Sequence, residues 1–144
     1  KLRIVGYGDK ILLTKLVSKL GLEEKVECLG VLEGQRLADI IRQCAVFVLP
    51  SLSEGLPTTL LEAMSCGKPV IATEGIGLND VLGQAGLYVP PRSANKIATA
   101  TITLLRDRNL RLELGRSARQ IIESKHSWSE IAPLVERLYQ KAAS

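Results

Sequence analysis

Aromatic side chains are scarce in this sequence, with one Trp, one Phe and three Tyr among 144 residues. This scarcity argues against a stacking platform for single-stranded nucleic acid and against an aromatic sugar-binding face. No apolar run approaches the roughly 20 residues that a membrane-spanning helix needs, and the first residues do not form a secretory signal. We therefore expect no nucleic-acid partner and no membrane-spanning segment.

Cysteine is also rare, and the spacing of Cys28, Cys44 and Cys66 matches no metal site. Each lies beside apolar residues, so we predict three buried, reduced thiols. Reduced thiols are typical of a reducing compartment, which favours a cytoplasmic location.

Positive charge exceeds negative charge only slightly, with a net charge of +4. The arginines of residues 106–119 alternate with apolar residues, a pattern typical of a solvated helix face. A peripheral contact with an anionic membrane surface, at the cytoplasmic face, is a secondary interpretation of the same pattern.

Short apolar runs alternate with helical patterns along the whole chain. We predict strands at residues 2–5, 26–29, 45–49, 69–72 and 87–89. Helices are predicted at 10–21, 35–44, 58–66, 94–106, 108–125 and 128–143, with a helical turn at 80–82. Strands separated by helices indicate a parallel sheet covered on both faces. We therefore predict a single α/β domain over residues 1–144: a doubly wound, Rossmann-like parallel sheet with a helical C-terminal tail and ligands at the carboxyl ends of its strands.

Residues 49–64 are the most informative stretch, because a Ser/Gly/Pro loop joins a buried strand directly to a helix. We expect this helix to begin near Pro57, since proline is favoured at the first helical position. The N–H groups of Thr58, Thr59 and Leu60 would then be free and lie at the positive end of the helix dipole. This arrangement predicts an anion site suited to a phosphate, with the Thr58 hydroxyl as a further donor.

Two carboxylates, Glu54 and Glu62, lie on either side of this predicted phosphate site. A phosphate would repel them, so they are better suited to accept hydrogen bonds from hydroxyl groups next to the phosphates. A nucleotide sugar offers such hydroxyls on both sides of its diphosphate. For Glu62 an alternative stays open, because Thr59-x-x-Glu62 also matches a capping box. Glu54 is a loop acid with no helix to cap, which favours ligand contact.

Residues 50–73 resemble the signature of group 1 (family 4) glycosyltransferases, which have the GT-B fold. Residues 2–8, 26–30, 86–91 and 127–130 are similar to other landmarks of that family, so the resemblance spans essentially the whole chain. It implies the C-terminal donor-binding domain of a GT-B enzyme that transfers a sugar with retention. It also implies a nucleotide-sugar donor, such as a UDP- or GDP-sugar, without a metal or another cofactor.

The resemblance assigns roles to particular residues. Glu54 would be catalytic and contact hydroxyl groups of the transferred sugar, while Glu62 would accept hydrogen bonds from the ribose. The remaining donor-binding residues would lie near the sugar and diphosphate (Gly55, Leu56, Thr58, Thr59) and near the nucleobase (Gly30, Val31, Leu32).

Part of the family pattern is missing from this sequence. The family's basic diphosphate-binding loop and its N-terminal acceptor domain both precede the strand that matches residues 2–5. We therefore expect the acceptor domain to be a partner from the same parent chain, and the first βα unit of this domain to lie outside these residues. The 144 residues alone are expected to have no transferase activity.

Two other functions remain open. Gly6-x-Gly8 after a strand resembles part of a dinucleotide fingerprint, which would indicate an NAD-type domain of an oxidoreductase. The missing basic loop, and Pro57 with no N–H, would fit a non-catalytic interaction module of the same fold. A glycosidase acid/base pair of Glu54 and Glu62 is disfavoured, because nothing suggests that they flank a bond. For the tail, we expect Ser127-x-x-Glu130 to cap the last helix and Trp128 to pack it onto the domain.

Overall fold

The computed structural model describes residues 1–52, 57–75 and 78–143. They form two compact units, Lys1–Asp39 and Ile40–Ser144, and helix α2 (Gly34–Gln43) crosses the boundary between them. Both units combine parallel strands with helices, so the predicted α/β class with a helical tail is confirmed. The described strands form one sheet in each unit rather than a single continuous sheet. The prediction that residues 1–144 form one domain stays a prediction.

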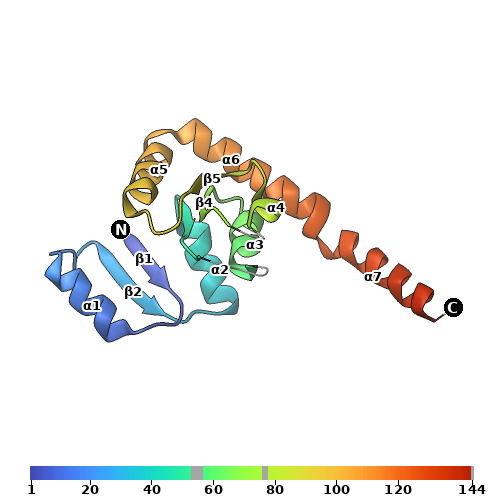
Figure 1. Cartoon of the computed structure of the whole chain (residues 1–144), viewed down its shortest axis with the longest axis horizontal. Helices are drawn as coiled ribbons and strands as arrows, with labels where there is room; N and C mark the ends of the chain where they lie inside the picture. The colour runs from blue at the N-terminus through green and yellow to red at the C-terminus, as the bar shows by residue number, and fades with distance from the viewer. Residues whose placement is uncertain (53–56, 76–77, 144) are drawn as a thin grey trace. The chain divides into compact units, whose positions relative to one another are not determined.

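The first unit is a strand-helix-strand motif (Figure 1) built from β1 (Leu2–Val5), α1 (Lys10–Lys19) and β2 (Val26–Gly30). Strands β1 and β2 are parallel, with Leu2 opposite Val26. Helix α1 begins after Asp9, whose carboxylate accepts a hydrogen bond from the Leu12 N–H at 2.9 Å, as an N-cap residue does. Only Val17 of this helix is buried, so much of its apolar side remains exposed.

The second unit contains the other two parallel pairings, in the order β3-β4-β5. Its elements are β3 (Phe47–Leu49), α3 (Thr58–Ser65), β4 (Val70–Thr73), α4 (Leu78–Leu82), β5 (Gly86–Val89), α5 (Ala94–Arg106), α6 (Arg108–Ile121), the π-helix η1 (Ile122–His126) and α7 (Trp128–Ala142). Every residue of β4 is buried, as the central strand of a covered parallel sheet should be. The core joins Ile71 and Val89 of the sheet to Leu104 of α5 and Leu114 of α6.

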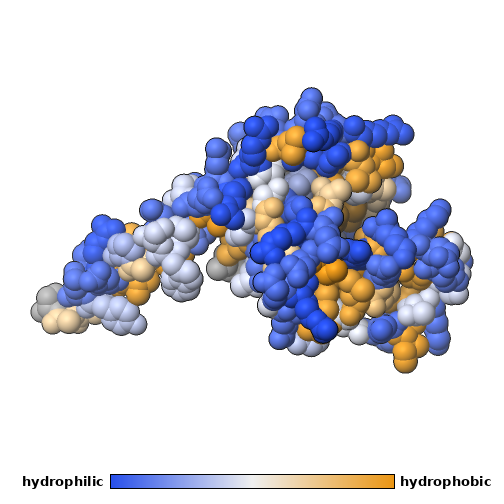
Figure 2. All heavy atoms as spheres, turned by 180° about the vertical axis from the view of Figure 1, so that it is seen from behind, coloured by the Kyte–Doolittle hydropathy of each residue, from blue (hydrophilic) through white to orange (hydrophobic). Residues whose placement is uncertain are grey.

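Helix α7 extends away from the rest of its unit (Figure 1) and contains no buried residue. Trp128 is 81% exposed, so the prediction that it packs the tail onto the domain is wrong. Ser127 is the N-cap, but its hydroxyl bonds the Glu123 carbonyl and the Ser129 hydroxyl instead of capping the helix. The hydroxyl of Ser127, which we expected to cap α7, therefore donates to the π-helix that precedes α7. Figure 2 shows apolar surface, in orange, on the face seen there.

Candidate functional site

The start of α3 is the centre of the predicted site, and it follows the loop that leaves the carboxyl end of β3. Pro57 is buried and is the N-cap of α3, with φ −75° and ψ 96°. The helix start agrees with the predicted range 58–66, and Pro57 lies just before the first helical residue rather than at it. Its ring fixes φ in a range that a helix accepts, but the extended ψ lies outside the helical range, so the helix begins at Thr58.

The first turn of α3 leaves two backbone donors available for a ligand. Leu60 donates its N–H to the Pro57 carbonyl at 3.0 Å, and Leu61 donates to the same oxygen at 3.3 Å. The prediction that the Leu60 N–H is free is therefore wrong, because the tight first turn uses it. Among the described residues, the N–H groups of Thr58 and Thr59 have no acceptor. Two unpaired amides at the positive end of a helix are suited to an anion.

Glu62 lies on the same exposed side of α3 as Thr58 and Thr59. The opposite side is fully buried through Leu60, Ala63 and Met64, which orients the helix. Thr59 is the second helical residue rather than the N-cap, so the capping-box interpretation of Glu62 is wrong. Within the described part of the chain, its carboxylate has no hydrogen bond or ion pair and remains available for a ligand.

Three predicted site residues, Glu54, Gly55 and Leu56, lie outside the described residues. Their assignment as the catalytic and sugar-binding positions stays a prediction.

The loops after β3 and β4 lie side by side at the carboxyl edge of the sheet. A Cβ atom added to Gly75 would lie 3.9 Å from the Leu52 carbonyl oxygen. Beyond β4, the Glu74 N–H donates to the Val89 carbonyl at 2.9 Å, and Glu74 itself is exposed. We made no prediction for this carboxylate, although an acid directly after a buried strand was a usable signal.

The predicted nucleobase loop belongs to the first unit and follows β2. Gly30 has φ +71°, a left-handed conformation that favours glycine. Its carbonyl accepts the Gly6 N–H at 2.9 Å, which ties together the turns after β1 and β2. Val31 is exposed and Leu32 is half-buried, so one apolar side chain of this loop faces solvent.

The dinucleotide alternative requires an acid near the end of the second strand that is available for a ribose. The nearest acid, Glu27 in β2, pairs instead with Lys1 Nζ at 2.6 Å and with Arg3 Nε at 3.2 Å. The hydrogen bond from Lys1, and to a smaller extent that from Arg3, holds the pKa of Glu27 below its usual value. The carboxylate is thus already occupied by protein cations, and the dinucleotide reading is not favoured.

All three cysteines are free, as predicted, but they are half-buried rather than buried. Burial raises the pKa of the Cys44 thiol, and the nearby Lys68 ammonium counteracts this in part. Among residues 1–52, 57–75 and 78–143, no three His, Cys, Asp or Glu side chains are arranged to hold a metal ion.

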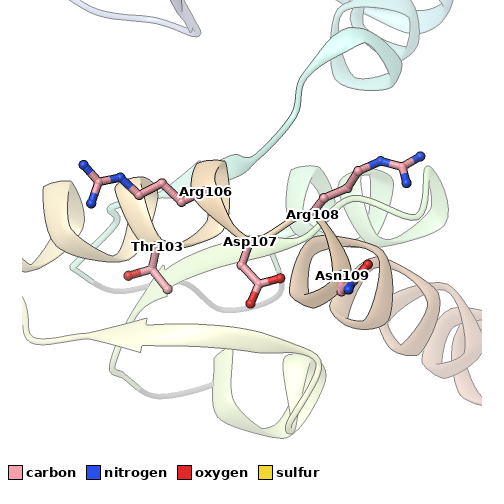
Figure 3. A pocket seen from close by; sticks show the side chains of 5 residues that line it. All are labelled: Thr103, Arg106, Asp107, Arg108 and Asn109. Carbon is pink, nitrogen blue, oxygen red and sulfur yellow. The ribbon is translucent and has the colours of Figure 1, made fainter.

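Two cavities of the second unit lie away from the start of α3. One, of about 540 Å³, is at the α5–α6 junction and is lined by Thr103, Arg106, Asp107, Arg108 and Asn109. Figure 3 shows the side chains of Arg106 and Arg108 extending in opposite directions, so they do not converge on one anion. The other, of about 310 Å³, lies between the end of α3 and α6, lined by Gly67, Leu112, Gly115, Arg116, Arg119 and Gln120. The candidate site is therefore the open surface around Thr58, Thr59 and Glu62.

Comparison with known proteins identifies the family. A sequence model of "Glycosyl transferases group 1" matches residues 1–107. The chain belongs to the group 1 glycosyltransferases. It is 32% identical to an uncharacterized glycosyltransferase of Methanocaldococcus jannaschii, over 99% of this chain and 37% of that protein. The GT-B assignment of the fold is thereby supported by sequence.

Solved glycosyltransferase structures agree with this assignment. Sucrose-phosphate synthase from Thermosynechococcus elongatus superposes with a TM-score of 0.90 at 32% identity, over 99% of this chain and 39% of that one. TarM of S. aureus, in a complex that contains UDP, superposes with a TM-score of 0.85 at 25% identity, over 96% and 29%. The chain thus spans less than two-fifths of the length of these relatives. No helix in the described ranges is both long and apolar enough to cross a membrane.

Proposed function

We propose that this chain is the donor-binding part of a glycosyltransferase and that the start of α3 binds the diphosphate of a nucleotide sugar. The observation that carries the proposal is that, among the described residues, neither the N–H groups of Thr58 and Thr59 nor the neighbouring carboxylate of Glu62 has a partner in the protein. Together they offer donors for phosphate oxygens and an acceptor for hydroxyl groups within one exposed helix face.

The position of this face in the fold supports the same function. Ligands of doubly wound sheets bind outside the carboxyl ends of the strands, and α3 starts beyond the carboxyl end of β3. The relatives support it as well, since one of them at 25% identity was solved with UDP.

In this proposal the chain's residues act mainly by binding and by stabilising charge. The bond between the anomeric carbon and the diphosphate breaks, and the diphosphate leaves with the electron pair. The amides of Thr58 and Thr59 and the helix dipole stabilise that charge. The sugar carbon forms its new bond to an acceptor hydroxyl oxygen on the same face, which is the retaining outcome, and the proton of that hydroxyl passes to the departing diphosphate. Glu54 would contact the transferred sugar and Glu62 the ribose.

We propose that the reaction also needs an N-terminal acceptor domain of the same parent chain. The relatives' greater length supports this partner. The nucleotide sugar would be a UDP- or GDP-sugar, used without a metal.

The test is an NMR titration of the nitrogen-15-labelled chain with UDP, GDP and UDP-glucose, and with uridine as the control that lacks phosphate. We expect weak binding of a diphosphate that shifts the Thr58 and Thr59 amide signals, and no such shift with uridine. Glu62→Gln should weaken nucleotide binding, whereas Glu113→Gln, an exposed acid on α6, should not.

Absence of binding by every nucleotide, both to this chain and to a longer protein that includes the acceptor domain, would contradict the proposal. Shifts confined to residues outside α3 and the neighbouring loops would place the nucleotide elsewhere and would also contradict it.

A further inference from the structure

We propose that Arg119 of α6 is a positioning residue for the donor helix, holding the C-terminal end of α3 so that its N-terminal amides stay in place. This inference rests on the proposed function of α3, which packs against α6 and η1. Arg119 is 54 residues from the end of α3 in sequence, and no sequence motif connects the two.

The hydrogen bonds at the end of α3 single out one carbonyl group. The last four carbonyl groups of a helix lack partners within the helix. In α3, three of them accept backbone N–H groups: Glu62 from Cys66 at 3.0 Å, Ala63 from Lys68 at 3.1 Å and Met64 from Gly67 at 2.9 Å. The fourth, Ser65, accepts a hydrogen bond from the Arg119 guanidinium. Within the described chain, that guanidinium is the partner of the last α3 carbonyl.

The Arg119 side chain is itself oriented by a second contact. Its Nε lies 2.6 Å from Glu123, one turn further along the same helical segment. The guanidinium thus joins a carboxylate on its own segment to a carbonyl on α3. This arrangement fixes its direction, although the side chain is 52% exposed.

The backbone of α6 supports the same end of α3 at close range. A Cβ atom added to Gly115 would lie 2.2 Å from the Gly67 carbonyl oxygen, in the turn that ends α3. Only glycine therefore fits at Gly115. Two contacts therefore attach the end of α3 to α6: Gly115 packs against the Gly67 carbonyl, and Arg119 donates to the Ser65 carbonyl.

A shift at the end of α3 is transmitted to its start because the helix is short and stiff. Eight residues span about 12 Å, and Leu60, Ala63 and Met64 are fully buried along the inner side. Hydrogen bonds from Thr58 and Thr59 to a phosphate depend on donor positions within a few tenths of an ångström. The positive charge of Arg119 also stabilises the negative C-terminal end of the α3 dipole. Because solvent and salt screen that charge over the length of the helix, its effect on a phosphate at the start of α3 is smaller than the effect of keeping the helix in position.

Arg116 provides a matched control. It lies one turn earlier on α6 and lines the same cavity as Arg119, but the hydrogen bond that the described residues give it stays within α6, from its Nε to the Leu112 carbonyl at 3.2 Å. Replacing it removes an equal charge from the same helix without touching α3.

The experiment measures hydrogen exchange of the α3 amides and the affinity for UDP in the wild-type chain and in Arg119→Gln, Arg119→Lys and Arg116→Gln. We expect Arg119→Gln to speed exchange in α3 but not in β4, and to weaken UDP binding about fivefold, the effect of one lost hydrogen bond. Arg119→Lys keeps a charged donor and should recover most of the affinity. Arg116→Gln should match the wild type.

Equal α3 exchange in Arg119→Gln and Arg116→Gln would overturn the inference, and so would a wild-type UDP affinity in Arg119→Gln. If Arg119→Gln does not fold, Glu123→Gln gives a milder test, because it removes only the carboxylate that orients Arg119. Unchanged hydrogen exchange of α3 in Glu123→Gln would then overturn the inference. A wild-type chain that binds no nucleotide would contradict the proposed function instead, and α3 exchange would still decide whether Arg119 holds the helix.

Discussion

At the residue scale, the candidate site depends on backbone donors more than on side chains. The N–H of Thr58 has no acceptor among the described residues, while the N–H of Leu60 is already used within the first turn. A donor of this kind is removed only by proline, and Thr58 is the first helical residue, where proline is tolerated.

We therefore predict that Thr58→Pro weakens UDP binding at least about tenfold while α3 still forms. A hydrogen bond to a charged phosphate contributes about 1.5–3 kcal/mol. Thr58→Ala keeps the N–H and should bind almost as the wild type does. Titration calorimetry gives the affinities, and circular dichroism checks the helix content. Equal affinities of the two variants would show that this amide does not contact the ligand.

Cys44 gives a prediction about pH. Burial raises the pKa of its thiol, so at a given pH the folded chain contains less of the reactive thiolate than the unfolded chain. We expect alkylation of Cys44 by iodoacetamide to be slower in the folded chain than in urea, with the half-maximal rate at higher pH. Because the folded state disfavours the thiolate, this group's contribution to stability is present below the ordinary thiol pKa and is lost as pH rises through the folded value. Mass spectrometry of the Cys44 peptide measures the rate, and equal pH profiles would refute the prediction.

At the element scale, sequence periodicity located the helices and strands closely. Helix α5 occupies the predicted residues, 94–106, because its apolar spacing is regular and Asp107 follows it. The predicted and observed elements differ at their ends, where single hydrogen bonds determine which residue is the last of a helix or strand. Strand β3 begins at Phe47, two residues later than predicted, and the predicted helix at 108–125 ends as a π-helix after Ile121.

Helix α7 leads to a prediction about truncation. None of its residues is buried, so removing residues 128–144 should leave the melting temperature of the chain nearly unchanged. Removing residues 122–144 also deletes Ile122, which is buried, and the contacts of η1 with α3, and should lower that temperature by several degrees. Thermal melts of both truncations test this. An equal loss in the two would mean that α7 stabilises the unit.

At the scale of the whole molecule, each unit presents surfaces that its own residues do not cover. Strands β1 and β3 each pair with one described neighbour only. Leu12 of α1 is 67% exposed and Leu20, the C-cap of that helix, is 59% exposed. Several apolar residues of α7 are exposed as well. Exposed apolar surface of this extent is typical of contact with further protein. The peripheral membrane contact inferred from the basic helices stays a prediction.

We predict that extending the chain at its N-terminus by a strand and a helix, the unit expected from the family resemblance, raises the melting temperature. An added parallel strand can pair with an open strand edge, and its helix can cover apolar side chains. Differential scanning calorimetry of the extended and present chains tests this. A polyglycine-serine extension of equal length is the control, and equal melting temperatures would contradict the prediction.

The sequence alone determined the α/β class, the order of elements and the family, because apolar periodicity and the long motif of residues 50–73 are local signals. It also placed Thr58, Thr59 and Glu62 together, since residues three and four apart share a helix face. Only the tertiary structure decided that the Leu60 N–H is used, that Glu62 does not cap α3, and that Arg119 meets Ser65. Those outcomes depend on single hydrogen bonds and on contacts between residues far apart in the chain, which no local pattern encodes.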